Sequence, residues 1–171
     1  MPSLSKQDQF VLSLIPVGDY LEIGASHPID WNNTHLLEQN GWTGLSIDID
    51  RNCLRPWQDV RKNTLIIADA LTIPYTKNKR IDYLSIDIEP ALQTFKCLKH
   101  IFTFNPKISI ITFEHDWYYD QSTKMDSRRY LTDLGFELVH ADVECHLGAY
   151  EDWWVNPRTV SVEMAKQFQL Y

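Results

Sequence analysis

Five short apolar segments, each with an acidic residue at or near its end, constrain the fold of this chain more than any other feature. They are rich in Ile, Leu and Tyr. Continuous apolar runs of this length are typical of strands buried on both faces, as in a parallel sheet covered by helices. The five segments are 19–25, 44–50, 64–70, 81–89 and 108–116.

The segments between these runs are mostly helical in pattern. Ser5 and Asp8 resemble a capping box that opens a first helix. Pro90 fits the first turn of a helix whose apolar stripe includes Phe95. Gly135 marks the end of a later helix. Repeated strand–helix–strand units predict a doubly wound α/β domain.

The pattern changes after Gly135. Segments 136–143 and 150–157 both read as strands, with only a short loop between them. They predict an antiparallel hairpin at the sheet edge. Trp153 and Trp154 are adjacent in the second strand, so one is expected to face the core and the other to face out. Since no linker or repeat interrupts the sequence, we predict a single domain over residues 1–171.

Charge and cysteine content restrict the function classes. The chain has 171 residues and a formal net charge of −7. Nucleic acids and anionic membranes attract basic surfaces, so we expect neither as a partner. Cys53, Cys97 and Cys145 lie far apart, which argues against a disulfide framework or a Cys-x-x-Cys metal site. The N-terminal residues lack a signal-peptide pattern, and no apolar run has membrane-spanning length. We therefore expect a cytoplasmic protein.

The acidic residues at the strand ends are expected to converge on one site. In an open α/β sheet, ligands bind beyond the carboxyl ends of the strands. Carboxyl groups gathered at one edge need a cation, a hydrogen-bond donor or a raised pKa to offset their repulsion. A single such acid is usually only a helix cap, but all five strands carry one. The five acids are Glu22, Asp48, Asp69, Asp87 and Glu114.

The loop after the first predicted strand discriminates between two nucleoside-containing cofactors. It keeps Gly24, but Ser26 and Ile29 replace the second and third glycines of G-x-G-x-x-G. The cradle for a pyrophosphate is therefore missing, which disfavours NAD. S-adenosylmethionine has no phosphate and needs a close backbone approach at one glycine, which we expect Gly24 to provide. Asp48 stands where either cofactor would have its ribose-binding acid.

Four segments, in order along residues 19–157, resemble the FkbM-type family of class I S-adenosylmethionine-dependent methyltransferases. The resemblance implies a mostly parallel, seven-stranded Rossmann-like sheet with an antiparallel last strand. His27 and Pro28 stand where family members commonly carry Asp-Gly, and Pro90 stands where Gly is common. The four segments are LEIGASHPIDWNNTHLLEQNGWTGLSIDID, IDYLSIDIEPALQTFKCL, ITFEHD and YEDWWVNP.

The resemblance also implies which residues hold the cofactor. Glu22 and Gly24 match the first cofactor motif. Asn33 and Thr34 match an Asn-Thr pair that opens the next helix. Asp48 matches the ribose-binding acid, and Asp69 with Ala70 matches the adenine side. The expected cofactor residues are Glu22, Gly24, Ala25, Ser26, Asn33, Thr34, Asp48, Ile49, Asp69, Ala70 and Asp87.

The ends of the fourth and fifth predicted strands hold the candidate catalytic residues Asp87, Glu114 and His115. Methyl transfer often requires removal of a proton from the acceptor, and imidazole is a common general base near neutral pH. The alternative is that His115 only hydrogen-bonds a neighbouring loop. Asp87, Glu114 and Asp116 are also hard oxygen donors that suit Mg²⁺. A metal-free acidic rim is the alternative that we favour.

We therefore expect an S-adenosylmethionine-dependent methyltransferase that acts on a small-molecule or sugar-type acceptor, at oxygen. Two alternatives stay open. One is an S-adenosylmethionine-binding module that lacks catalysis or depends on a partner. The other, less favoured because of the missing glycines, is an NAD-dependent oxidoreductase.

Overall fold

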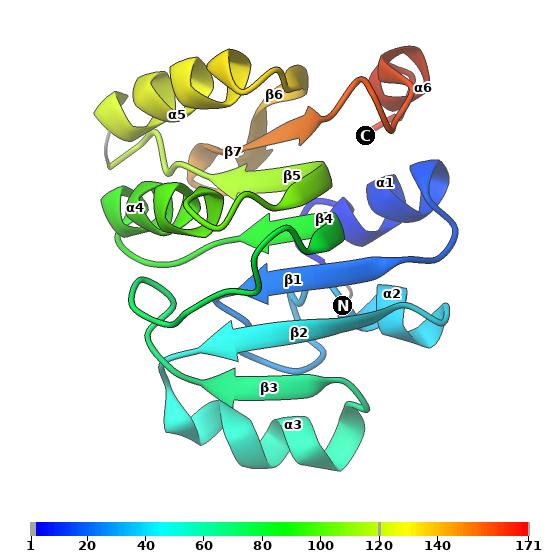
Figure 1. Cartoon of the computed structure of the whole chain (residues 1–171), viewed down its shortest axis with the longest axis vertical. Helices are drawn as coiled ribbons and strands as arrows, with labels where there is room; N and C mark the ends of the chain where they lie inside the picture. Colours follow the sequence, from blue (N-terminus) through cyan, green and yellow to red (C-terminus); the bar gives the residue numbers. More distant parts are fainter. Residues whose placement is uncertain (1–2, 120, 171) are drawn as a thin grey trace.

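The computed structural model describes residues 3–119 and 121–170. Its centre is a seven-stranded sheet in the order β3-β2-β1-β4-β5-β7-β6 (Figure 1). β7 runs antiparallel to both of its neighbours, and the other adjacent strands pair in parallel. The predicted sheet, with its antiparallel last strand, is confirmed. The strands are β1 (Asp19–Ile23), β2 (Thr43–Asp48), β3 (Thr64–Ile67), β4 (Arg80–Ile86), β5 (Lys107–Glu114), β6 (Glu137–Cys145) and β7 (Gly148–Val155).

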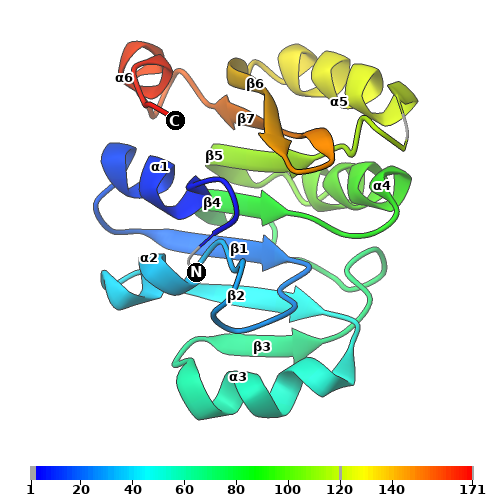
Figure 2. The same ribbon diagram turned by 180° about the vertical axis from the view of Figure 1, so that it is seen from behind.

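Helices cover both faces of the sheet. α4 and α5 lie on one face, whereas α1, α2 and α6 lie on the other, which Figure 2 shows from behind. Among the described residues, no helix combines the length and apolar character needed to cross a bilayer. The helices are α1 (Gln7–Leu14), α2 (His35–Gln39), α3 (Leu54–Val60), α4 (Ala91–Phe102), α5 (Gln121–Asp133) and α6 (Val162–Lys166), with a 3₁₀ turn, η1 (Arg51–Cys53).

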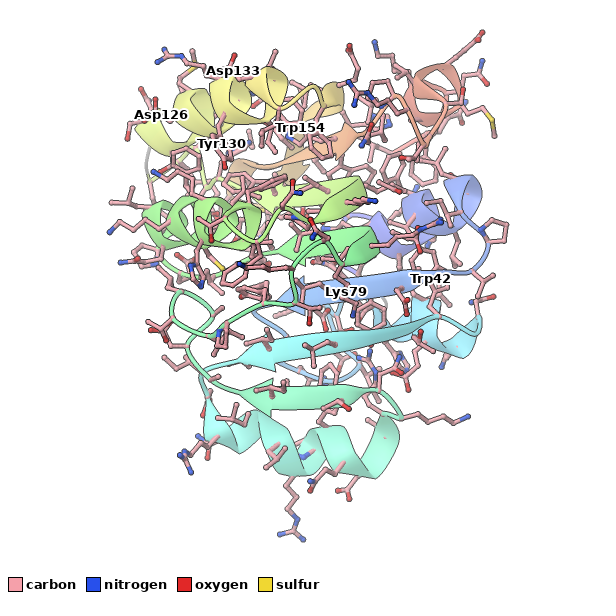
Figure 3. The ribbon with its side chains drawn as sticks, viewed as in Figure 1. Trp42, Lys79, Asp126, Tyr130, Asp133 and Trp154 are labelled. Carbon is pink, nitrogen blue, oxygen red and sulfur yellow. The ribbon has the colours of Figure 1, made fainter. Side chains whose placement is uncertain are left out.

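Two apolar cores, one on each face of the sheet, enclose the adjacent tryptophans of β7. Trp154 is buried in the core beneath α4 and α5, where Figure 3 shows it near Tyr130. Trp153 is buried in the opposite core, with its ring centroid 4.6 Å from that of Phe10 in α1. The expectation that one tryptophan faces out is therefore wrong, because α1 and α6 cover the second face of β7.

The first helix begins differently from the predicted capping box. Lys6 occupies the N-cap position with a left-handed backbone and no side-chain cap. The carboxylate of Asp8 accepts a hydrogen bond from Ser3 Oγ at 2.6 Å instead. Ser5 Oγ accepts a hydrogen bond from the Tyr150 hydroxyl at 2.9 Å. Ser5 therefore ties the segment before α1 to β7, and Ser3 and Asp8 hold this segment against α1, but neither pair caps the helix.

No helix joins β3 to β4, so the predicted alternation is broken once. Residues 68–79 form turns and irregular chain. Pro74 and the polar run that follows provide no apolar stripe on which a helix would pack. The neighbouring sheet face is consequently less covered, and Ile66 is 39% exposed there. Pro90 precedes α4 as its N-cap, after a cis peptide bond with Glu89.

Candidate cofactor and active site

A cavity of about 1270 Å³ opens at the carboxyl ends of the parallel strands. The structure brings all five predicted strand-end acids to its wall: Glu22, Asp48, Asp69, Asp87 and Glu114. Most of the other predicted cofactor residues also line it: Gly24, Ala25, Ser26, Asn33, Ile49 and Ala70. Thr34 does not, but it supports the wall by donating a hydrogen bond to Glu22 at 3.0 Å. Most of the residues selected from the sequence therefore share one site.

Gly24 is required by its contact with β4. Its φ is +81°, and an added Cβ would lie 1.7 Å from the carbonyl oxygen of Asp87. A side chain at this position would push the end of β1 away from β4, whether or not a ligand is bound. Gly24→Val would therefore strain the fold itself, in addition to blocking the close backbone approach expected for the cofactor.

Asp48 fixes the opening loop from the end of β2. Its two carboxylate oxygens accept hydrogen bonds from the backbone N–H groups of Ser26, at 2.7 Å, and Asp50, at 2.8 Å. Ser26 has φ of +47°, and Asp48 compensates this unusual backbone by accepting its N–H. Ile49 is 72% exposed on the cavity rim. Asp48 and Ile49 thus offer a carboxylate and an apolar surface side by side, as an adenosine requires.

Glu22 and Asn33 form the buried wall near the opening loop. Glu22 accepts hydrogen bonds from Thr34 and from Ser46 Oγ, the latter at 2.7 Å. Burial raises the pKa of Glu22, and the nearby Arg61 opposes this shift. Asn33 donates to Ser85 Oγ at 3.0 Å, but its Oδ1 has no hydrogen-bond partner within the described chain. An unsatisfied buried acceptor on a cavity wall suits a ligand with an N–H group.

Arg61, at the end of α3, is a residue that the sequence analysis missed. It is 7% exposed and makes an ion pair with Glu38 at 2.7 Å. Its guanidinium also lies over the Trp57 ring, 4.1 Å from the centroid. Through these contacts it ties α2 and the opening loop to the sheet. Its other hydrogen-bond acceptors are Pro28 O, Asn32 Oδ1, Tyr20 Oη and Thr34 Oγ1.

Asp87 and Glu114 lie together at the β4–β5 end of the cavity. Burial raises the pKa of both carboxyl groups, and neighbouring acids raise that of Glu114 further. Glu114 is 8% exposed, and its Oε2 has no hydrogen-bond partner among the described residues. Tyr150 and His146, from β7 and the preceding turn, complete this end of the wall. His146 is a further residue that the sequence analysis did not place at the site.

His115 and Asp116 do not line the cavity. His115 follows Glu114 directly, so its side chain points away from Glu114, and it is fully buried with Nε2 3.4 Å from Asp152 Oδ1. The structure therefore gives no support to His115 as a general base and instead favours a packing role. Asp116 is also fully buried and accepts a hydrogen bond from the Tyr118 hydroxyl at 2.5 Å.

The predicted Mg²⁺ site is not supported. Asp87, Glu114 and Asp116 do not bring their oxygens together as a ligand set. Within residues 3–119 and 121–170, the group that does so is His115, Asp142 and Asp152. Arg128 already contacts both of its acids, and Lys124 contacts Asp142. Protein cations therefore occupy the positions that a metal would need.

The comparisons with known proteins identify the fold. No protein-family model and no curated protein sequence matches the chain. A protein assigned as an rRNA methylase from Clostridium thermocellum superposes with a TM-score of 0.64 at 11% identity, over 91% of this chain and 96% of that one. The chain has the fold of class I S-adenosylmethionine-dependent methyltransferases.

Two further structures carry the same class I methyltransferase fold. A TehB-like S-adenosylmethionine-dependent methyltransferase from Corynebacterium glutamicum has a TM-score of 0.61 at 12% identity, over 90% of this chain and 89% of that one. TrmK from M. capricolum, in complex with S-adenosylhomocysteine, has a TM-score of 0.59 at 16% identity, over 88% and 66%. The narrower resemblance to the FkbM-type family stays a prediction.

Within this methyltransferase fold, the cavity fits S-adenosylmethionine better than a dinucleotide. The Ser26 N–H is already bonded to Asp48, so it is not free to bind a pyrophosphate. No Lys or Arg is among the described residues that line the cavity, so a pyrophosphate would lack a counter-charge. The unsatisfied oxygens of Asn33 and Glu114 suit the ammonium group of a methionine moiety or of an acceptor.

Proposed function

We propose that this chain is an S-adenosylmethionine-dependent methyltransferase that acts on a small-molecule acceptor. The observation that carries this proposal is the cavity at the strand ends, which has an acidic wall without Lys or Arg among its described residues. Such a wall suits a cofactor with a net positive charge and disfavours one with phosphates. The class I methyltransferase fold supports the same cofactor.

Each predicted site residue then has a defined task. Bound S-adenosylmethionine would supply an activated methyl group on a sulfonium. Asp48 would accept hydrogen bonds from ribose hydroxyls, and Asn33 Oδ1 would accept one from the methionine ammonium. The carboxyl pair of Asp87 and Glu114 would take the acceptor proton in place of His115. Burial raises the pKa of both carboxyls, so an ionised member of the pair would hold the transferred proton more firmly than an exposed carboxylate.

Oxygen as the acceptor atom, expected from the sequence, gains no support from the wall of the cavity. A developing oxyanion needs hydrogen-bond donors or cations, and the wall has acids in that region instead. A binding module without catalysis also stays open. Methyl release from S-adenosylmethionine, measured with a panel of acceptors, separates it from an enzyme, because a module would bind the cofactor without turnover.

Asp48→Ala is expected to weaken S-adenosylhomocysteine binding by about 1.5–3 kcal/mol, the range for hydrogen bonds to a charged group. Isothermal titration calorimetry measures the change, and NAD should not compete with the ligand. Asp126, exposed on α5 in Figure 3, provides the matched control. Asp126→Ala should leave the affinity unchanged. If the two variants bind S-adenosylhomocysteine with equal affinity, Asp48 does not contact the cofactor.

A further inference from the structure

The charge of the cavity wall is strongly one-sided. Seven acidic residues line it, without a Lys or Arg among the lining residues that the structure describes. A wall of this sign attracts cations and repels phosphates or carboxylates. The seven acids are Glu22, Asp30, Asp48, Asp69, Asp87, Glu89 and Glu114.

Three of these acids remain after the cofactor has been placed. Asp48 and Asp69 lie on the adenosine side. Glu22 Oε2 already accepts hydrogen bonds from Thr34 and Ser46. Asp30 lies on the opening loop, where its carboxylate is 3.8 Å from His27 Nδ1. Those that remain are Asp87, Glu89 and Glu114, at the end of the cavity formed by β4 and β5. We place the methyl acceptor at this end of the cavity.

Glu114 provides a second, independent indication of a ligand. It is 8% exposed, it lies on the cavity wall, and its Oε2 has no hydrogen-bond partner within the described chain. A buried carboxyl oxygen left unpartnered is costly, so it calls for a donor that the chain does not supply. Asp87 lies beside Glu114 and can share a proton with it, but no described residue donates to Glu114 Oε2, which leaves that donor to come from a ligand.

We propose that the methyl acceptor is a cationic amine whose ammonium group binds to Glu114, Asp87 and Glu89. This inference rests on the proposed methyltransferase function and names its substrate class. Three N–H groups of an ammonium match three carboxylates, and each bond is assisted by charge. Leu4 and Trp31 on the same wall offer apolar surface to the rest of the amine, and Trp31 is 68% exposed.

The same carboxyls prepare the amine for reaction. An ammonium has no free electron pair, so it must lose a proton before it can accept a methyl group. The bound cation favours the ionised form of the Asp87–Glu114 pair, which takes that proton. Once the proton has moved, the pair is a buried neutral acid, the form that burial favours by raising the pKa of both groups. The freed pair of electrons forms the N–C bond while the C–S bond of the sulfonium donor breaks and its electrons stay on sulfur. The proton then passes to water at the cavity mouth.

The test compares three probes that differ in one group: 2-phenylethylamine, 2-phenylethanol and 3-phenylpropionate. Calorimetry on the chain saturated with S-adenosylhomocysteine should detect the amine and neither of the others. Glu89→Gln, on the exposed rim, and Glu114→Gln should each weaken amine binding by about 10- to 100-fold. The affinity for S-adenosylhomocysteine should stay within about twofold in Glu89→Gln. With S-adenosylmethionine, the amine alone should yield a methylated product.

Several results would overturn the amine proposal. One is that the chain binds the alcohol or the acid more tightly than the amine. Another is that no amine binding is detected at millimolar concentration. A third is that the amine binds equally well to the unmodified chain and to both variants. Loss of cofactor affinity in Glu89→Gln would show that this carboxyl serves the methionine ammonium instead. The proposed function fails separately, because in that case the unmodified chain would not bind S-adenosylhomocysteine at all.

Discussion

Arg61→Ala is expected to lower the free energy of unfolding by about 3–5 kcal/mol, the cost of removing one partner from a buried ion pair. The variant leaves Glu38 without its cation, and it also removes donors from the opening loop and from Tyr20. Urea denaturation followed by circular dichroism measures the change. Cofactor affinity should fall as well, because Arg61 holds the loop through Pro28 and Asn32.

Arg55, exposed on the same helix, provides the matched control for Arg61. Arg55→Ala should change the free energy of unfolding by less than about 0.5 kcal/mol. Arg61→Lys should recover only part of the lost stability, because a single ammonium group cannot donate to several separated acceptors at once as the planar guanidinium does. An Arg61→Ala variant as stable as Arg55→Ala would show that this network does not support the loop.

Glu151→Gln should make the chain more stable at neutral and alkaline pH. Burial raises the pKa of Glu151 from 4.5 to about 8, so the folded state keeps its proton while the unfolded state releases it. Folding is therefore penalised progressively as pH rises from about 4.5 to about 8. At about 1.4 kcal/mol per pH unit, the penalty reaches at most roughly 4–5 kcal/mol above pH 8.

The glutamine variant has the shape of the protonated acid and cannot ionise. Its side-chain oxygen can still accept the bonds that Glu151 Oε2 takes from Gln7 and from Trp153, at 2.9 and 2.5 Å. Urea denaturation of both proteins at several pH values between 5 and 8 gives the difference in stability. This difference should grow with pH, since the other titrating groups are common to both proteins. A difference that stays constant with pH would contradict the protonated, buried state of Glu151.

The sheet and its acidic edge were predictable because both depend on local pattern. Apolar runs that end in acids identify buried parallel strands, and the geometry of such a sheet then brings Glu22, Asp48 and Asp87 to one edge. The hairpin of β6 and β7 was predictable for the same reason, since two strand patterns follow one another with no helix between. No long-range information was needed for these features.

Features that depend on packing between distant segments were not predictable. Arg61 lies in a polar stretch with no motif, and its role appears only where α3 meets the opening loop. His115 adjoins the cavity residue Glu114, but the alternation of side chains turns it into the interior. Trp153 is buried because α1 and α6 fold back over β7, which its own sequence does not reveal.

A crystal structure of the chain grown with S-adenosylhomocysteine most directly tests whether this cavity is a cofactor site. We expect the adenosine at the ends of β2 and β3, with the ribose hydroxyls hydrogen-bonded to the Asp48 carboxylate. The methionine end should lie along the Gly24 loop, with its ammonium near Asn33 Oδ1. An empty cavity at saturating ligand concentration, or an adenosine bound elsewhere on the molecule, would contradict the proposed function.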